Sequence, residues 1–279
     1  MADKTASSGG GIWELIKTVV IALLIAGVFR SLFFQPFWIP SGSMKDTLLI
    51  GDFVFVNKMA YGYSYASCPS VKIPAVGLDV DASDICGFMQ NSDGRFLASE
   101  PERGDVVVFR HPVTGRDYIK RLIGLPGDQI QIKAGIIHLN GVPMQQVPAG
   151  VFTETMEPQG AFGNRPRCEN GAVGDGGMCN KSRAIETNPE GKSYAVLNIG
   201  PSFTDNTKVF TVPAGHYFMM GDNRDNSSDS RVDQIQGGVG FVPFKDLIGR
   251  ADRIVFSSAG RSMFFFWTWR SDRFFKAVQ

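Results

Sequence analysis

An uninterrupted apolar segment near the N-terminus, TVVIALLIAGVF at residues 18–29, constrains this chain more than any other feature. It lies between Lys17 and Arg30, and as a helix it is too short to cross about 30 Å of hydrocarbon. Extended to residues 13–34, with both cations reaching toward the membrane surfaces, it attains spanning length. The sequence therefore predicts one transmembrane signal anchor over 13–34, preceded by a flexible cytoplasmic tail at 1–12.

Two other interpretations of the apolar segment stay open. A cleaved signal peptide has a similar core, but the residues that follow, SLFFQPFW at 31–38, offer no small-x-small cleavage site. A buried core helix is the second alternative. Because no other apolar run of spanning length follows, the rest of the chain is expected on one side of the membrane.

After the anchor, the pattern changes to short strands separated by turns. In residues 50–63, Val54 and Val56 alternate with Phe53 and Phe55, which is the period of a half-buried strand. Similar runs recur along the chain with Pro-Gly-Asp and Asn-Gly turns between them. The sequence predicts a mainly β fold: an antiparallel β-sheet catalytic body with a β-rich inserted subdomain, preceded by one transmembrane helix.

The predicted body consists of residues 35–143 and 206–279, with two stretches that resemble insertions. Residues 63–100 carry the first two cysteines, and residues 144–205 are rich in Gly, Pro and Asn and carry the other two. The aromatic and basic segment at 263–276, MFFFWTWRSDRFFK, predicts either an amphipathic element at the membrane surface or a partly buried terminal helix or strand.

The four cysteines fall into local pairs, Cys68 with Cys86 and Cys168 with Cys179. Their spacings match no common zinc pattern and the chain has only 3 histidines, so we expect no metal site and no cofactor. In an oxidising compartment the local pairs predict two disulfides, and four free thiols are the alternative.

The charge balance argues against one class of partner. The chain has 28 Lys and Arg residues against 27 Asp and Glu residues, for a net charge of +1. No basic stripe stands out from this background, so we expect no nucleic-acid partner.

Three segments carry the residue types that catalysis needs. PSGS at 40–43 predicts a tight turn that can present a serine hydroxyl. DYIKRLIGLPGD at 117–128 places Lys120 in a strand, where lysine is rarely buried unless it is paired or useful. GDNRDNSSDSR at 221–231 has no bulky apolar residue and predicts a loop whose side chains bond its own backbone. Taken singly, a connecting turn and a solvated lysine are the simpler explanations of the first two segments. The third is either a solvated turn or a specified charge network, because Asp222, Asp225 and Asp229 lie close in sequence to Arg224 and Arg231.

A catalytic serine needs a general base, and the residues alone do not choose one. Spacing does not exclude a Ser-His-Asp site, although the three histidines are poorly placed for it: His111, His138 and His216. A Ser-Lys dyad needs a neutral amine, and a free lysine is neutral in only about one molecule in a thousand at pH 7.4. Burial can lower the lysine pKa by up to about 3–5 units. Because Lys45 and Lys58 also lie near Ser43 in sequence, chemistry alone leaves Lys120 as one of three candidates.

Together and in order, these segments resemble bacterial type I signal peptidase, the leader peptidase family of Ser-Lys serine proteases. The matching pieces are the anchor, PSGSM, TLLIGDFVFVNKMAYG, RGDVVVFRHP, DYIKRLIGLPGD, GDNRDNSSDSR, GGVGFVP and LIGRA. The resemblance implies a membrane-anchored serine endopeptidase that removes signal peptides from exported preproteins after an Ala-x-Ala-like site. It also implies a protein of the bacterial inner membrane, in contact with the lipid bilayer and with the export machinery as a partner. The single predicted anchor makes this a single-pass protein, and the cysteine pairs favour a body on the periplasmic side.

The resemblance assigns roles to individual residues. Ser43 is expected to be the nucleophile and Lys120 the general base. Ser41 is expected to join the Ser43 N–H in an oxyanion hole, and Ser227 to hydrogen-bond and orient the lysine. Shallow apolar subsites for small side chains before the cut are expected to be lined by Ile39, Pro40, Met44, Leu48 and Ile119. A structural charge pair is expected between Asp229 and Arg231.

The chain departs from the family pattern in three places. Asp46 stands where a proline is usual, the stretch at 63–100 is unusually long, and there is one anchor where many members have two. Two alternatives therefore remain: a dedicated processing peptidase for one secretion or pilus substrate, and a non-catalytic membrane-anchored β domain that binds peptides. A cytosolic self-cleaving Ser-Lys protease of the repressor type is disfavoured by the anchor.

Overall fold

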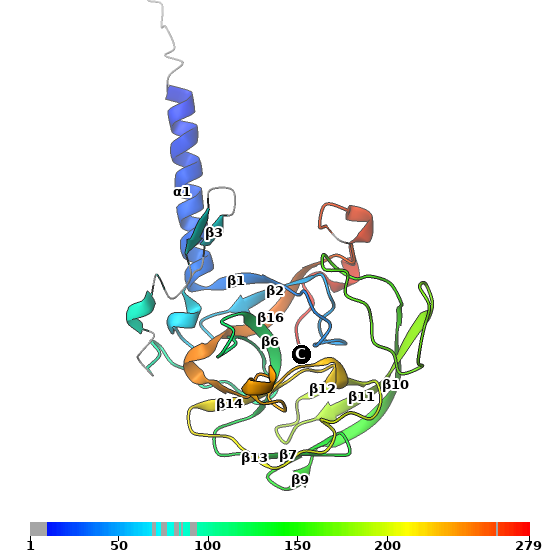
Figure 1. Ribbon diagram of the computed structural model, residues 1–279. Coiled ribbons are helices and arrows are strands. Elements are labelled where there is room, and N and C mark those ends of the chain that lie inside the picture. The colour runs from blue at the N-terminus through cyan, green and yellow to red at the C-terminus, as the bar shows by residue number, and fades with distance from the viewer. Residues whose placement is uncertain are drawn as a thin grey trace, which may run out of the picture.

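The computed structural model describes residues 10–68, 71–73, 77–80, 84, 86–89, 94–260 and 262–279. A single N-terminal helix projects from a body built of antiparallel sheets (Figure 1). The mainly β fold class predicted from the sequence is therefore confirmed. Most of the predicted tail at 1–12 lies outside the described residues.

Helix α1 spans Gly10–Leu32, so it begins within the predicted tail and covers most of the predicted anchor. Its 23 residues measure about 34 Å at the usual rise per residue. Residues 11–30 are exposed on every side, and no part of the body covers them. A helix that is apolar all round and uncovered by protein is typical of a membrane span. Among the described residues it is the one helix long and apolar enough to cross a bilayer.

The largest sheet has seven strands in the order β1-β2-β16-β5-β6-β14-β15, and every pair is antiparallel. Its strands are β1 (Phe34–Trp38), β2 (Asp52–Asn57), β16 (Leu247–Ser257), β5 (Val106–Arg110), β6 (Asp117–Gly124), β14 (His216–Met220) and β15 (Phe241–Pro243). Strand β1 follows α1 almost directly and forms one edge of this sheet. The turn after β1 and the central strand β6 carry the predicted nucleophile and base.

Two smaller sheets extend the body at the end away from α1 (Figure 1). One consists of β13 (Phe210–Thr211), β7 (Gln129–Lys133), β8 (Ile136–Leu139) and β9 (Val142–Pro143). The other, called the inserted sheet here, consists of β10 (Gln145–Thr155), β11 (Met178–Thr187) and β12 (Ser193–Asn198). Between β8 and β9, Asn140 and Gly141 both have positive φ angles, 51° and 84°, as a tight hairpin turn requires.

The alternating pattern of residues 53–56 is realised in β2. Val54 and Val56 are fully buried, whereas Phe55 is exposed on the opposite face. The two valines belong to a hydrophobic cluster that also includes four of the five residues predicted to line substrate subsites: Ile39, Met44, Leu48 and Ile119. The nucleophile turn is therefore built directly on the core of the main sheet.

The stretch at 63–100 is fastened to the body by Arg95. Its guanidinium donates hydrogen bonds to the carbonyls of Tyr61, Gly62, Phe244 and Leu247 and to the hydroxyl of Ser64. The two short strands β3 (Val71–Ile73) and β4 (Leu78–Val80) form a hairpin within this stretch. Several of its other residues lie outside the described part of the chain.

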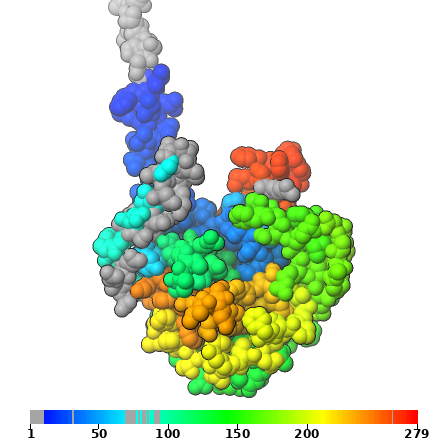
Figure 2. Space-filling model, in the orientation of Figure 1, coloured from blue at the N-terminus to red at the C-terminus, as the bar shows by residue number. Residues whose placement is uncertain are grey.

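The aromatic segment near the C-terminus forms short 3-10 turns, η7 (Phe266–Thr268) and η8 (Ser271–Arg273), and not the longer helix or strand that was one alternative. We call its exposed rings the aromatic lobe: Phe264, Phe265, Phe266, Trp267 and Trp269. The lobe projects from the same end of the body as α1, where it is coloured red in Figure 2.

Candidate active site

Three segments from distant parts of the chain meet at the candidate site: the turn at 41–47, strand β6 and the loop at 221–231. Asn223 links the loop at 221–231 to the turn at 41–47. Its backbone N–H donates to Ser43 O at 3.0 Å, and its side-chain amide donates to Gly42 O at 2.8 Å. A Cβ atom on Gly221 would lie 2.6 Å from Ser43 O, so only glycine permits this close approach.

Ser43 and Lys120 are in direct contact. Lys120 Nζ lies 2.6 Å from Ser43 Oγ and 3.0 Å from the carbonyl oxygen of Ile119. Lys120 is only 3% exposed and Ser43 only 8% exposed. The amine therefore sits in a largely dry position in which it contacts the hydroxyl and a backbone carbonyl, with no carboxylate bonded to it in the described part of the chain.

Burial lowers the pKa of Lys120 to about 8 from its ordinary value of 10.5. The negative charges of Asp229 and Asp222 oppose this effect, and the positive charge of Arg231 adds to it. At a pKa of about 8, roughly a fifth of the molecules carry a neutral Lys120 at pH 7.4. A neutral amine in contact with a serine hydroxyl can accept its proton.

The other two lysines considered from the sequence point elsewhere. Lys45 Nζ bonds Glu154 at 2.5 Å and Gln159 at 2.7 Å. Lys58 Nζ donates to the Ser67 carbonyl at 2.6 Å. Within the described residues, neither of these lysines and no histidine bonds Ser43, so Lys120 alone of the candidate bases reaches its hydroxyl.

Ser41 and Ser227 differ in their exposure and contacts. Ser41 is exposed and lines the cavity that opens beside Ser43. The Ser227 hydroxyl is buried and meets no partner at hydrogen-bonding geometry, Lys120 included. It approaches the Asp229 carboxylate and adds to the groups that lower the pKa of that residue.

Asp229 and Arg231 form a buried two-point ion pair. Arg231 donates from Nε to Asp229 Oδ1 at 2.8 Å and from a terminal nitrogen to Asp229 Oδ2 at 2.9 Å. Burial alone would raise the pKa of Asp229, but attraction to Arg231 and hydrogen bonds from it and from Gly221 outweigh burial and lower that pKa. The pair fixes the shape of the loop at 221–231 below Lys120.

Comparison with known proteins matches most of the chain to one family. The profile of the family described as signal peptidase, peptidase S26, matches residues 12–256. This chain belongs to that family. The signal peptidase I of Rickettsia akari (strain Hartford) is 38% identical over 254 residues, 88% of this chain and 79% of the relative. The signal peptidase I of Rickettsia typhi (strain Wilmington) is 38% identical over 245 residues, 85% of this chain and 77% of the relative.

One solved structure, a signal peptidase I from Enterococcus faecalis V583, aligns with 55% of this chain and 97% of its own at 22% identity. At a TM-score of 0.29 this likeness adds nothing to the family assignment. The family profile and the Rickettsia relatives identify the chain as a serine endopeptidase of the signal peptidase family, whose reaction is the removal of signal peptides.

In this member of the signal peptidase family, two further buried ion pairs stabilise the site, and the sequence did not predict their partners. Arg121, next to the predicted base, bonds both oxygens of Asp222 at 2.7 and 2.8 Å. Arg224 in the same loop bonds both oxygens of Glu186, which comes from the inserted sheet, at 2.6 and 2.9 Å. The Asp-rich and Arg-rich loop signalled such a network, but the partner of Arg224 lies 38 residues away and carries no local signal.

The predicted apolar subsite residues divide into two groups. Ile39, Met44, Leu48 and Ile119 are buried in the core cluster described above. Pro40 is exposed, and its carbonyl accepts a hydrogen bond from the side-chain amide of Asn164 at 2.8 Å. The contact of these five residues with substrate stays a prediction.

A cavity of about 210 Å³ opens beside Ser43. Polar and charged side chains from the nucleophile turn, the loop at 221–231, the inserted sheet and the connection between β10 and β11 line most of it: Ser41, Ser43, Lys45, Glu154, Gln159, Asn164, Arg165, Arg167, Lys181, Asn223 and Asn226. Within the described part of the chain, no group of three or more His, Cys, Asp or Glu side chains is arranged to hold a metal ion.

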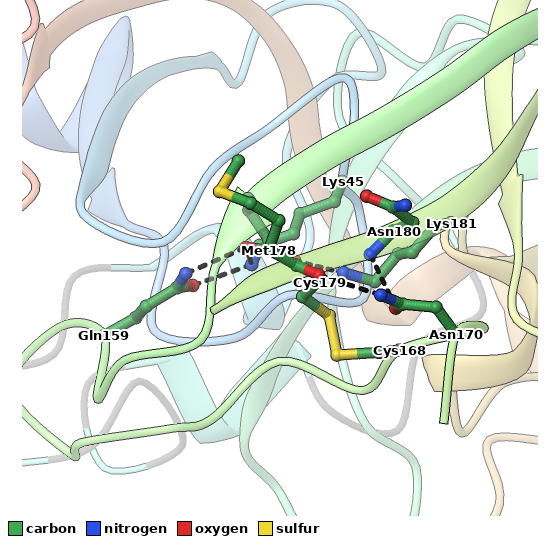
Figure 3. Close-up of a disulfide and its surroundings, with 9 residues drawn as sticks. Lys45, Gln159, Cys168, Asn170, Met178, Cys179, Asn180 and Lys181 are labelled. Atoms are coloured by element: carbon green, nitrogen blue, oxygen red, sulfur yellow. Dashed lines mark hydrogen bonds and ion pairs between the residues drawn. A yellow bond between two sulfur atoms is a disulfide. The ribbon is translucent and has the colours of Figure 1, made fainter. Parts of the chain in front are cut away.

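The four cysteines form two disulfides, in the local pairs that the sequence suggested. Cys68 joins Cys86 with a Cα–Cα distance of 6.4 Å, and Cys168 joins Cys179 at 5.0 Å. The second disulfide joins the connection between β10 and β11 to β11 itself, close to Lys45, Gln159 and Lys181 (Figure 3).

Proposed function

We propose that this chain is a membrane-anchored signal peptidase that cleaves exported preproteins after an Ala-x-Ala-like site, with Ser43 as nucleophile and Lys120 as general base. The observation that carries the proposal is the 2.6 Å contact between Lys120 Nζ and Ser43 Oγ in a nearly dry position. A buried amine with a lowered pKa beside a hydroxyl is the arrangement that activates a serine without histidine.

In the proposed reaction, neutral Lys120 accepts the Ser43 proton while Oγ attacks the carbonyl carbon before the cut. The resulting oxyanion is stabilised by the Ser43 N–H, which bonds no acceptor in the described residues, and by the Ser41 hydroxyl. Lys120, now charged, gives its proton to the leaving amine. A water then hydrolyses the acyl-enzyme, with Lys120 again as base.

The substrate is proposed to bind as an extended strand beside the nucleophile turn. Strand β1 is an edge of the seven-stranded sheet, and edge strands can add a peptide through main-chain hydrogen bonds that tolerate many sequences. The proposed subsites border the apolar core cluster that contains Ile39, Met44 and Ile119, and shallow subsites select small residues by excluding large ones. This combination supports broad recognition with a strict requirement for small side chains before the cut.

The proposed location is the bacterial inner membrane, with the body on the periplasmic side and the export machinery supplying substrates. Helix α1 supports an anchor, and the aromatic lobe at the same end of the body supports contact with lipid (Figure 1). The two disulfides support an oxidising compartment for the body.

The decisive experiment compares cleavage of a purified Ala-x-Ala preprotein by the wild type and by Ser43→Ala, Lys120→Met and Ser228→Ala. We expect the first two variants to lose cleavage while keeping the wild-type melting temperature or a higher one. Ser228 lies in the same loop and is exposed, and among the described residues its hydroxyl bonds only the Gly237 carbonyl, so Ser228→Ala is the matched control and should cleave normally. Full cleavage by Ser43→Ala would refute the proposal.

A panel of unrelated preproteins separates general from dedicated processing. The proposal predicts that several of them are cleaved at comparable rates, each after its own small-x-small site. Cleavage of a single panel member, with Ser43 still required, would instead identify a dedicated processing peptidase.

A further inference from the structure

We infer that Glu154 of the inserted sheet is a positioning residue for the nucleophile, and that it acts through Lys45. Lys45 is two residues beyond Ser43 in the same turn, and its amine reaches away from Ser43 to the Glu154 carboxylate at 2.5 Å. The inference rests on the proposed Ser43–Lys120 mechanism. It means that the inserted sheet, which carries neither Ser43 nor Lys120, affects the rate of cleavage.

Glu154 is shared by two buried lysines. One oxygen bonds Lys45, and the other bonds Lys181 of strand β11. Gln159 completes the group, because its carbonyl oxygen accepts from Lys45 at 2.7 Å and its amide donates to Glu154 at 2.8 Å. Lys45 is 4% exposed and Lys181 is 0% exposed. Figure 3 shows Lys45, Gln159 and Lys181 converging beside the Cys168–Cys179 disulfide.

Strand register brings this group together. Glu154 of β10 pairs with Cys179 of β11, and Phe152 pairs with Lys181. Because side chains alternate along a strand, Glu154, Cys179 and Lys181 lie on one face of the inserted sheet. That face meets the nucleophile turn. Glu154, far from Ser43 in sequence, therefore contacts Lys45, which is two residues after Ser43.

The carboxylate cannot be removed without consequence for the turn. Two buried ammonium groups share a single negative charge, and a buried charge without a partner is strongly unfavourable. If Glu154 becomes neutral, Lys45 has to release its proton or turn toward water. Either change weakens the bond that ties the nucleophile turn to the inserted sheet. Ser43 is then held less firmly, whereas contact with Lys120 requires its hydroxyl to stay within hydrogen-bonding distance.

A second ion pair between the same two parts supports the inference. Asp46 accepts a hydrogen bond from Arg183 of β11 at 2.7 Å. Both side chains are about a third exposed, so this pair contributes little by itself. It shows that consecutive residues of the nucleophile turn are both bonded to the inserted sheet, and the buried pair Lys45–Glu154 is the stronger of the two.

The test measures kcat, KM and melting temperature for Glu154→Gln, Lys45→Met and the double variant in the full-length protein. We expect Glu154→Gln to lower kcat by about 10- to 100-fold with KM within about threefold, because the substrate-binding surface is retained. Since Glu154 acts through Lys45, the double variant should be no slower than the slower single variant. The control is Glu169→Gln. Glu169 is exposed on the same insertion, and within the part of the chain that the structure describes its carboxylate bonds only Ser182, so this variant should match the wild type.

Additive losses in kcat, or a loss confined to KM, would overturn the inference in favour of a direct substrate contact. A lower melting temperature with unchanged kcat would overturn it in favour of a purely structural role. If Glu154→Gln does not fold, Glu154→Asp keeps the charge on a shorter side chain, and we expect it to fold with an intermediate kcat. Wild-type kcat in that variant would also overturn the inference.

Ser43→Ala in the same assay separates failure of the proposed function from failure of the positioning role of Glu154. If it still cleaves, the proposed function fails; if it is inactive while Glu154→Gln is fully active, only the positioning role fails.

Discussion

Lys120 Nζ lies 2.6 Å from Ser43 Oγ, although the two residues are 77 positions apart and belong to a β-strand and a turn. The contact is made where the loop at 221–231 holds the nucleophile turn from one side and the inserted sheet holds it from the other. The chemistry of the site therefore depends on the packing of these segments, which keeps the amine of Lys120 away from water.

The first prediction concerns the pH dependence of cleavage. Because Lys120 must be neutral to accept the Ser43 proton, kcat/KM should rise with pH through a midpoint near the pKa of about 8. Below about pH 7 the rise should approach tenfold per pH unit, and it should level off above about pH 9. Steady-state kinetics from pH 5.5 to 10 test this, and a profile already flat at pH 6.5 would contradict it.

The second prediction is that Lys120→Met stabilises the protein while abolishing cleavage. The pKa of Lys120 is lower in the folded state, about 8, than its unfolded value of 10.5, so the folded state binds this proton less tightly. Wild-type stability should therefore increase by roughly 3 kcal/mol as pH rises from 8 to 10.5, and stay at its lower level below pH 8. Lys120→Met does not bury an ionisable amine and so avoids this loss of stability. Its free energy of unfolding should therefore exceed that of the wild type by about 1–3 kcal/mol at pH 7.

Urea denaturation at pH 7 and at pH 10 measures this difference. The gain from Lys120→Met should be largest at pH 7 and shrink toward pH 10. A variant that is less stable than the wild type at pH 7 would show that the folded state favours the charged lysine, which is the opposite of what a buried general base requires.

The third prediction concerns the buried pair of Glu186 and Arg224. Glu186 is fully buried, accepts two bonds from Arg224 and accepts a third from the Tyr194 hydroxyl at 2.9 Å. Glu186→Gln leaves a buried guanidinium without its anion, which should cost about 3–5 kcal/mol of unfolding free energy. Glu190→Gln, which breaks an ion pair of an exposed carboxylate with Arg103, should cost no more than about 1 kcal/mol. Equal losses in the two variants, measured by chemical denaturation, would contradict the importance assigned to the buried pair.

The fourth prediction places the aromatic lobe at the lipid surface. With Trp13→Phe and Trp38→Phe, the remaining tryptophans are Trp267 and Trp269, both exposed in the lobe. In proteoliposomes, brominated lipid should reduce their fluorescence by roughly half, because such rings settle at the headgroup boundary. Quenching by acrylamide in the aqueous phase, with none by brominated lipid, would show that the lobe faces away from the bilayer.

The sequence predicted local features well. The apolar run of α1 and the alternation in β2 follow from periodicity, and the turn at Asn140 and Gly141 follows from residue type. Chemistry alone could not choose Lys120 over Lys45 and Lys58, because the choice depends on which amine the fold brings to Ser43. Only the resemblance to a family named the base, and the contact between Lys120 and Ser43 is the geometry that this role requires.

Long-range pairings lay beyond the sequence. The strand order of the main sheet brings β16 between β2 and β5, and no local pattern encodes such a crossover. The Glu154 group was missed for the same reason: Glu154 lies 109 residues from Lys45, inside a predicted inserted subdomain whose strand pairing the sequence does not specify. Glu154 lies among polar residues, so the sequence does not indicate that strand pairing will bury its carboxylate.

The most direct test of the proposed Ser43–Lys120 dyad is an NMR titration of Lys120 itself. The full-length protein, labelled with ¹³C at lysine Cε and with Lys120 assigned through Lys120→Met, is followed from pH 6 to 11 in detergent. We expect a folded protein in which the Lys120 resonance titrates with a pKa of about 8. A Lys120 pKa near the ordinary value of 10.5 would contradict the dyad, because the amine would then carry its proton at every pH at which Ser43 has to lose one.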